Sequence, residues 1–221
     1  MRPIRIGEVT ASFEAATAKG TRPAVILAHG AGGRMDDRGM LALASLFCAR
    51  GLHVVRFNFP YTEKGSRRPD PMPVLKSCIA TVAERIHDES AVAKLILGGR
   101  SMGGRAASML VADGFACDGL LLLAYPLHPA GKPDQLRDAH LAKIAVPTLC
   151  LNGTRDTLCR RDLMDEVVKR LSGKWRMHWI EDADHGFHVR KSSGRTDDDV
   201  LREIGDQTER WLHDCRFTGR H

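Results

Sequence analysis

The sequence predicts an α/β protein with a mostly parallel sheet and helices on both of its faces. The main observation is that short apolar runs alternate with segments of helical periodicity along the whole chain. No internal repeat and no linker rich in proline or serine interrupts this alternation. With 221 residues the chain is long enough to bury one substantial core. We therefore expect residues 1–221 to form a single domain.

The strands are expected where apolar residues form short continuous runs. Six such runs lie at 23–29, 53–59, 94–98, 119–125, 147–152 and 175–181. Residues 5–14 are expected to add an edge strand near the N-terminus. The sheet thus has seven or so strands.

The helices are expected between these runs, where apolar residues recur with a period of 3.6. The segments with this pattern are 75–86, 105–111, 163–171 and 200–212. Residues 40–50 are nearly all apolar and precede Gly51, a residue suited to a helix C-cap. The longest connection, 126–145, leaves room for one short helix over 134–141 but not for a cap domain.

The pentapeptide Gly99-Arg100-Ser101-Met102-Gly103 fits the pattern G-x-S-x-G. It follows an apolar run and precedes a helical pattern, which is the context of a nucleophile elbow. Gly99 and Gly103 leave room where strand and helix nearly collide, and Ser101 stands at the helix N-terminus. Ser101 is therefore the candidate nucleophile, and an ordinary glycine-rich turn is the alternative.

A serine nucleophile needs a nearby base that is oriented by a carboxylate. In an open α/β sheet, reactive groups gather beyond the carboxyl ends of the strands. Asp156 and His185 both follow expected strands, and the chain order Ser101, Asp156, His185 is that of α/β hydrolases. Asp156 is the candidate acid and His185 the candidate base, although Asp156 also fits the role of a turn cap.

His188, three residues after His185, is the alternative base. Together with Asp182 and Asp184, the two histidines also resemble a metal cluster. A metal site needs ligands that converge from a rigid element, and no H-E-x-x-H motif is present. We therefore expect no metal.

The oxyanion of an acyl-transfer reaction is held by backbone N–H groups. We assign these donors to Met102, which follows the nucleophile, and to Ala31 in the glycine-rich loop at 28–33. Gly30 lets this loop approach the substrate, and His29 is expected to support the loop structurally. A dinucleotide-binding fingerprint is excluded because Met35 stands where its third glycine is needed.

The sequence leaves the roles of two basic features open, Arg100 and the loop at 64–71. Arg100 fits either an ion pair beneath the active site or a contact to an anionic group of the substrate. The basic loop at 64–71 follows a central strand and is expected on the active-site side of the sheet, where it is either solvated or in contact with substrate.

Composition excludes several other classes of protein. The net charge is +6, but the basic residues are scattered and few aromatic residues lie among them, so no nucleic acid is expected as a partner. No apolar stretch is long enough to span a membrane, and we expect no signal peptide because the first residues lack an apolar run. Six widely spaced cysteines without a C-x-x-C pair are read as reduced thiols, which indicates the cytoplasm.

Four strings together resemble the α/β-hydrolase superfamily over nearly the whole chain. They are VILAHGAGG at 25–33, RFNFPY at 56–61, RRP at 67–69 and GRSMGGRAA at 99–107. Within the superfamily, the chain is most similar to the small lidless group that resembles dienelactone hydrolase and includes testis-expressed protein 30 and its bacterial relatives. Dienelactone hydrolases carry a cysteine at the elbow, where this chain has Ser101.

This resemblance implies a three-layer α/β-hydrolase sandwich with seven or eight strands, no cap domain and a triad of Ser101, Asp156 and His185. The expected function is that of a serine hydrolase that cleaves a small carboxylic ester or thioester without a cofactor. The alternative is a non-catalytic interaction module that retains the hydrolase fold. The expected partner is a small-molecule acyl substrate, and the sequence assigns no oligomeric state.

Overall fold

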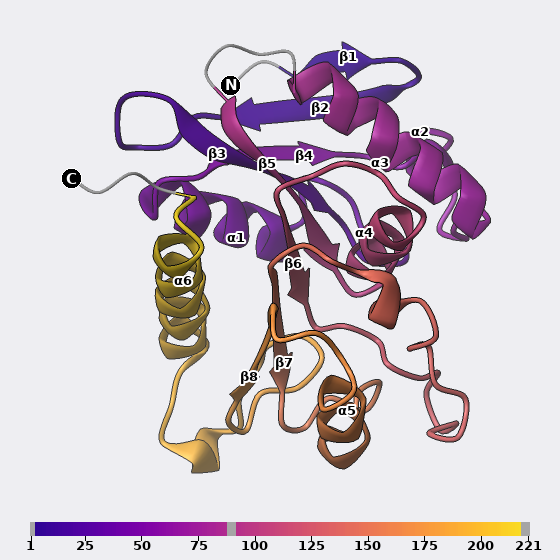
Figure 1. The fold of residues 1–221 in the computed structure, drawn as a ribbon, viewed down its shortest axis with the longest axis vertical. Coiled ribbons are helices and arrows are strands. Elements are labelled where there is room, and N and C mark those ends of the chain that lie inside the picture. The colour runs from indigo at the N-terminus through magenta and orange to yellow at the C-terminus, as the bar shows by residue number, and fades with distance from the viewer. Residues whose placement is uncertain (1–2, 88–91, 218–221) are drawn as a thin grey trace.

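In the computed structural model, the described residues 3–87 and 92–217 form an eight-stranded sheet between two layers of helices (Figure 1). The strand order is β1-β2-β4-β3-β5-β6-β7-β8. The strands span Ile4–Ile6 (β1), Val9–Glu14 (β2), Arg22–Ala28 (β3), His53–Phe57 (β4), Val92–Arg100 (β5), Gly119–Leu123 (β6), Thr148–Gly153 (β7) and Trp175–Ile180 (β8). Strands β3 to β8 pair in parallel, whereas β2 is antiparallel to both β1 and β4.

The central strands are apolar along their length because helices cover both of their faces. Val25, Ile26 and Leu27 of β3 are fully buried. In the sheet register, Ala28 at the end of β3 lies opposite Phe57 of β4 and Gly99 of β5. The carboxyl ends of these strands are therefore level, and the loops that follow them meet at one edge of the sheet.

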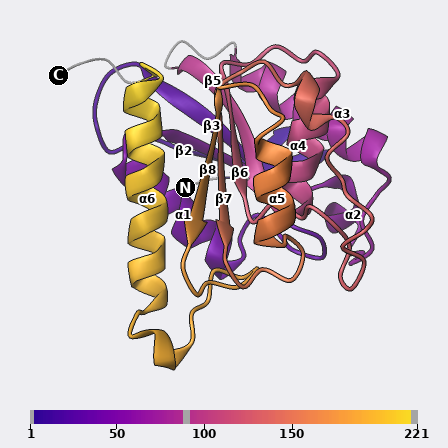
Figure 2. The ribbon, with the colours of Figure 1, turned by 60° about the horizontal axis from the view of Figure 1, so that its bottom comes forward.

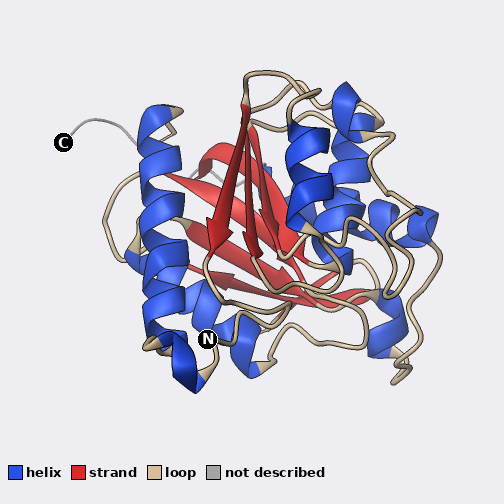
Figure 3. Cartoon of the chain, turned by 90° about the horizontal axis from the view of Figure 1, so that it is seen from below, coloured by secondary structure: helices blue, strands red, loops and turns tan. Residues whose placement is uncertain are grey.

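The helices form a layer on each face of the sheet. They span Arg38–Ala49 (α1), Pro60–Glu63 (α2), Met72–His87 (α3), Met102–Ala112 (α4), Arg161–Val168 (α5) and Asp197–Asp214 (α6). Helices α1 and α6 cover one face, and α3, α4 and α5 cover the other (Figure 2). Seen from below, the strands twist between the two layers (Figure 3). None of the helices in the described part of the chain is long and apolar enough to cross a membrane.

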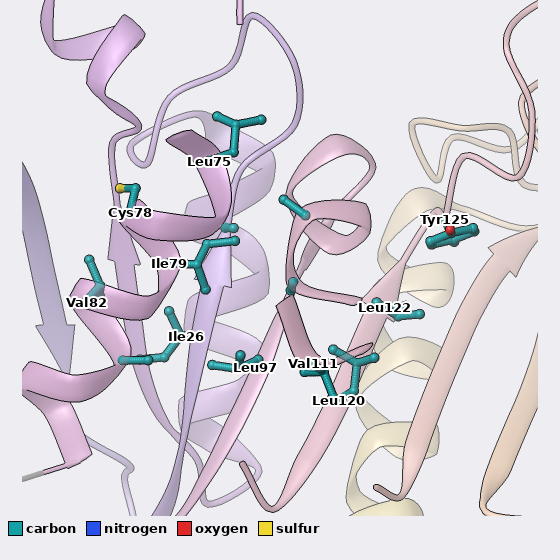
Figure 4. Close-up of a cluster of buried hydrophobic side chains, with 14 of the residues drawn as sticks. Ile26, Leu75, Cys78, Ile79, Val82, Leu97, Val111, Leu120, Leu122 and Tyr125 are labelled. Atoms are coloured by element: carbon teal, nitrogen blue, oxygen red, sulfur yellow. The ribbon is translucent and has the colours of Figure 1, made fainter. Parts of the chain in front are cut away.

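Each layer of helices packs on its face of the sheet through an apolar stripe. Leu75, Ile79 and Val82 of α3 belong to the same buried cluster as Ile26 and Leu97 from the sheet (Figure 4). Full burial of one such aliphatic side chain contributes about 1.5–3 kcal/mol. The stripe expected from the 3.6-residue period is therefore the face that anchors α3 to the sheet.

The N-terminal region is a hairpin of two strands, β1 and β2, instead of the single edge strand expected over 5–14. Gly7 has φ +57° and lies in the two-residue turn between Ile6 and Val9. A residue without Cβ adopts this conformation without steric penalty, so the chain reverses here. The expectation missed the turn because only one glycine marks it.

The short helix expected over 134–141 is absent, which corrects the sequence-based prediction. Within residues 126–145, the described backbone contains only a 3-10 turn at Leu141–Lys143. The N–H of Arg137 donates to the carbonyl of Leu127 at 2.7 Å, and the carbonyl of Arg137 accepts from the Tyr125 hydroxyl at 2.6 Å. The backbone N–H and carbonyl of Arg137 thus bond residues just after β6. They are therefore not available for the hydrogen bonds of a helix. The segment covers the sheet edge as an irregular loop, and no cap domain is formed.

Sequence signals mark the ends of three of the helices. Helix α6 begins with a capping box in which Thr196 and Asp199 satisfy each other's backbone N–H groups. After α1 the chain turns at Gly51, whose φ is +85°. Helix α2 was not expected, and it starts at Pro60, a residue suited to the first helical position.

Candidate active site

Ser101 connects the end of β5 to the start of α4 in a strained conformation. Its φ and ψ are 52° and −118°, a region that residues other than glycine rarely occupy. The Ser101 N–H donates to the carbonyl of Leu123 at 2.8 Å, and its carbonyl accepts from the Arg105 N–H at 3.0 Å. The turn is thus held by the neighbouring strand on one side and by its own helix on the other.

The structure brings Ser101, His185 and Asp156 into one line of hydrogen bonds. The Oγ atom of Ser101 lies 2.9 Å from Nε2 of His185. The Nδ1 atom of the same ring lies 2.8 Å from Oδ2 of Asp156. The three side chains come from the loops after β5, β7 and β8, so the level carboxyl ends of the parallel strands account for their meeting.

The carboxylate of Asp156 is almost fully buried and fixed by neighbours besides His185. Its Oδ1 accepts from the backbone N–H of Leu158 at 2.8 Å, and its Oδ2 accepts from the Asn152 side-chain amide at 3.2 Å. Asn152 also bonds both backbone groups of Tyr125 at the end of β6. Sequence reasoning missed Asn152; its only signal was a polar side chain at the end of an apolar strand.

The loop that carries His185 is shaped by close approaches and strained residues. Asp182 and Phe187 have φ values of +57° and +65° on either side of it. The Oδ1 atom of Asp184 accepts from the N–H groups of Gly186 and His188, at 2.7 and 3.0 Å. These bonds fix the backbone around His185, so the direction of its imidazole is determined by the fold.

His188 and Asp182, the other candidate residues of this loop, have partners of their own. His188 is largely exposed and pairs through Nδ1 with Asp197 at 2.7 Å. Asp182 lies 3.7 Å from Arg155 and 3.4 Å from Arg190. No group of three or more potential metal ligands is found among residues 3–87 and 92–217.

The glycine-rich loop after β3 lies directly beside Ser101. A Cβ built on Gly30 would be 3.6 Å from the Cβ of Ser101. Across the described residues, no acceptor is found for the backbone N–H of Ala31 or of Met102. Met102 is the first residue of α4, where a helix has no internal partner for its N–H. Both amides are therefore available to an oxygen atom bound near Ser101.

The buried ring of His29 supports the glycine-rich loop after β3. Its ring is fully buried, Nε2 accepts from the N–H of Phe59 at 3.2 Å, and Nδ1 lies 2.8 Å from the carbonyl oxygen of Gly30. Since Nε2 accepts, the proton is on Nδ1, which donates to Gly30. Burial lowers the pKa of His29, so the neutral ring is favoured. The ring therefore fixes the Gly30 peptide.

Gly99 and Gly103 occupy positions with no room for a side chain. An added Cβ would lie 2.6 Å from the carbonyl oxygen of Ala28 at Gly99, and 2.5 Å from the same atom at Gly103. Both distances are too short for a carbon atom. The glycines thus allow the elbow to pack against β3 and its following loop.

The sequence leaves two roles open for Arg100, an ion pair beneath the site and a contact to the substrate, and in the structure it bonds a main-chain carbonyl. Its Nη2 atom donates to the backbone carbonyl of His185 at 3.4 Å. The basic loop lies beside the glycine-rich loop, since a Cβ built on Gly32 would be 3.8 Å from the carbonyl oxygen of Arg67. The backbone of the basic loop is therefore on the same side of the sheet as Ser101.

Comparisons with known proteins agree with this architecture. The family model described as alpha/beta hydrolase domain matches residues 21–213. An α/β serine hydrolase homologue from Coxiella burnetii is similar, with a TM-score of 0.73, 21% identity and 96% of each chain covered. A dienelactone hydrolase from Anabaena variabilis has a TM-score of 0.73 at 18% identity, covering 96% of this chain and 95% of that one. An α/β serine hydrolase without a lid from Xanthomonas campestris has a TM-score of 0.71 at 19% identity, with 93% and 90% covered.

Proposed function

The chain belongs to the alpha/beta hydrolase domain family, and on that basis we propose that it is a serine hydrolase for small carboxylic esters or thioesters. The observation that carries the proposal is the line of hydrogen bonds from Ser101 through His185 to Asp156, at 2.9 and 2.8 Å. A hydroxyl, an imidazole and a buried carboxylate in this order form the arrangement that activates a serine nucleophile.

In the first half of the proposed reaction, Oγ of Ser101 attacks the acyl carbon of the substrate. Nε2 of His185 takes the hydroxyl proton as the new C–O bond forms. The tetrahedral intermediate then collapses, the bond to the leaving alcohol or thiol breaks, and that group receives the proton from Nε2. The product of this half is an acyl-enzyme on Ser101.

In the second half, water attacks the acyl carbon while Nε2 of His185 takes one of its protons. The bond to Oγ breaks, the carboxylic acid leaves, and Ser101 recovers its proton from His185. Asp156 keeps the proton of the neutral ring on Nδ1 and stabilises the imidazolium that forms in each half. Its burial and its bonds to Asn152 and Leu158 restrict it to this orientation.

The oxygen of the tetrahedral intermediate carries negative charge and needs donors already in place. We assign this role to the N–H groups of Ala31 and Met102. The support is that neither amide has an acceptor among the described residues and that Gly30 lies against Ser101. The N-terminus of α4 adds a favourable dipole at the same point.

The irregular loop over residues 126–145 supports the proposed substrate class. It forms no cap domain, so little apolar surface is available to enclose a long acyl chain. We therefore propose a small acyl substrate. We also propose a cytoplasmic location, because all six cysteines are free thiols in the structure and reduced cysteines are typical of that compartment.

The test is covalent labelling with a fluorophosphonate, which reacts with an activated serine. The wild-type protein should be labelled at Ser101, and Ser101→Ala should not be labelled. The matched control is Ser108→Ala, because Ser108 is fully buried and its hydroxyl is bonded to His140 at 2.8 Å. This variant should be labelled like the wild type. A wild-type protein that stays unlabelled, or an adduct on another serine, would overturn the proposal.

A further inference from the structure

Arg100 lies at the junction of the two loops that supply Ser101 and His185. It is the last residue of β5 and directly precedes Ser101 in the chain. Its side chain lines a cavity of about 360 Å³ together with residues of α1, of the loop after His185 and of α6, among them Gly39, Leu43, Phe187 and Leu201. This cavity borders residues next to Ser101 and His185, and the proposed reaction uses none of its side chains.

The guanidinium of Arg100 connects these loops through one specific contact. Nη2 donates to the backbone carbonyl of His185 at 3.4 Å. On its other side, a Cβ built on Gly39 would lie 3.3 Å from Nη1, so a side chain there would crowd the guanidinium and shift it slightly. Arg100 thus fills the space between the start of α1 and the loop of His185, and a glycine provides that space.

Among the described residues, Arg100 forms no ion pair with a carboxylate within 4.0 Å. Burial lowers the pKa of Arg100, and the more distant Asp184, Asp37 and Asp156 act in the opposite direction. The guanidinium of Arg100 is directed at the neutral carbonyl of His185, at the long end of the hydrogen-bond range.

We propose that Arg100 is a positioning residue that fixes the main chain of His185 relative to Ser101. This inference rests on the proposed serine hydrolase function. The bond acts on the carbonyl of His185 and leaves both ring nitrogens to Ser101 and Asp156. Because Arg100 adjoins Ser101 in the chain, the contact ties the base to the same strand end that carries the nucleophile. Loss of this contact would change the 2.9 Å distance between Nε2 of His185 and Oγ of Ser101.

The adjoining cavity makes this role testable by chemical rescue. Arg100→Ala should lower kcat for a small p-nitrophenyl ester by about tenfold or more, as expected for a lost hydrogen bond from a charged group. KM should change little, because Arg100 acts through His185. Guanidinium ions, at concentrations well below those that unfold proteins, should enter the cavity and restore part of kcat. Urea has a similar shape without the charge and should not restore it.

Two matched variants separate positioning from general stability. Arg100→Lys keeps the charge on a shorter side chain and should retain more activity than Arg100→Ala. In Gly39→Ala, alanine has a higher helix propensity than glycine in α1, but its Cβ crowds Nη1 of Arg100. This variant should therefore lower kcat severalfold without lowering the thermal midpoint, and it should have no further effect in the Arg100→Ala background.

The proposal is overturned if Arg100→Ala keeps wild-type turnover, or if its loss of turnover is not restored by guanidinium. Hydrogen exchange at the amides of Gly186 and His188 supplies a readout that is independent of activity. Both amides should exchange faster in Arg100→Ala and Arg100→Lys than in the wild type. If the wild-type protein neither hydrolyses esters nor reacts with fluorophosphonate, the proposed function fails. Unchanged exchange at these amides overturns the role of Arg100 in either case.

Discussion

The carboxylate of Asp156 lies 2.8 Å from Nδ1 of His185 at a position that is only 4% exposed. The same carboxylate accepts from the backbone N–H of Leu158 and from the Asn152 side chain. These two bonds hold the side chain of Asp156 in one orientation, with Oδ2 directed at the imidazole. An acid that accepts from Nδ1 keeps the ring proton there and leaves Nε2 free to accept from Ser101.

Asp156→Asn should therefore reduce ester hydrolysis strongly without unfolding the protein. The asparagine amide can donate to Nδ1, which would move the ring proton to Nε2 and remove the base. Loss of the acid by such a change costs on the order of 10⁴-fold in kcat. The control is Asp162→Asn, which alters an exposed carboxylate paired with Arg160. Equal activity of the two variants would show that Asp156 does not orient the base.

His185→Ala and His188→Ala should differ widely in activity. Removal of the base of a triad lowers kcat on the order of 10⁴-fold or more. His188 is exposed, and its partner is Asp197 at the start of α6. Its loss should change kcat less than about threefold, since exposed ion pairs contribute little. The measurement is steady-state hydrolysis of p-nitrophenyl acetate, and a reversed order of the two effects would contradict the assignment.

The fold was largely predictable because its signals are local. The strands β3 to β8 are short apolar runs, and α3 and α6 show a clear 3.6-residue stripe. The triad candidates could also be found, because each follows a recognisable strand in the expected order. The choice between His185 and His188 depends on the bonds of Asp184 to the loop amides, which the sequence does not reveal.

The features that sequence reasoning missed depend on contacts between distant segments. The helix expected over 134–141 does not form because Tyr125 and Leu127 bond the backbone of Arg137. The partner of Arg100 is a main-chain carbonyl, and any residue type supplies such a group. Asn152 acts through residues on two neighbouring strand ends. Residue type alone indicates none of these pairings.

Gly103→Ala should destabilise the protein far more than Gly173→Ala. The new Cβ at 103 would lie 2.5 Å from the carbonyl oxygen of Ala28, which belongs to a central strand and cannot move aside. Such overlap in a packed core costs about 1–3 kcal/mol, and occasionally more. At Gly173 no atom lies within 4 Å of the added Cβ, so the change should stay within about 0.5 kcal/mol. Urea unfolding of both variants gives the comparison.

The stability of the protein should depend on the protonation of His140. Burial lowers the pKa of His140 to about 4, while the unfolded chain has an ordinary value near 6.5. Between these values the unfolded state takes up a proton that the folded state does not. The free energy of unfolding should thus fall as the pH drops from about 6.5 to 4, by at most about 1.4 kcal/mol per pH unit from this group.

His140→Gln should remove this part of the pH dependence. The amide of glutamine can still bond the hydroxyl of Ser108, which lies 2.8 Å from Nε2 of His140. Urea unfolding at several pH values, compared between wild type and variant, isolates the contribution from other histidines such as the buried His29. Parallel curves for the two proteins over the interval from 4 to 6.5 would show that His140 does not titrate as described.

The preference for acyl chain length should reflect the missing cap domain. Each buried CH₂ group contributes roughly 0.8 kcal/mol, so an enclosed acyl site would raise kcat/KM steeply with every added carbon. The irregular loop over 126–145 offers no such enclosure. We expect p-nitrophenyl acetate and butyrate to be hydrolysed in preference to the palmitate ester. We also expect no rise in rate at an oil–water interface, because no lid is present to open there.

The measurement is kcat/KM against chain length, with and without detergent micelles. A steady increase up to palmitate, or a jump in rate where micelles form, would reveal a long acyl site and contradict the proposed substrate class.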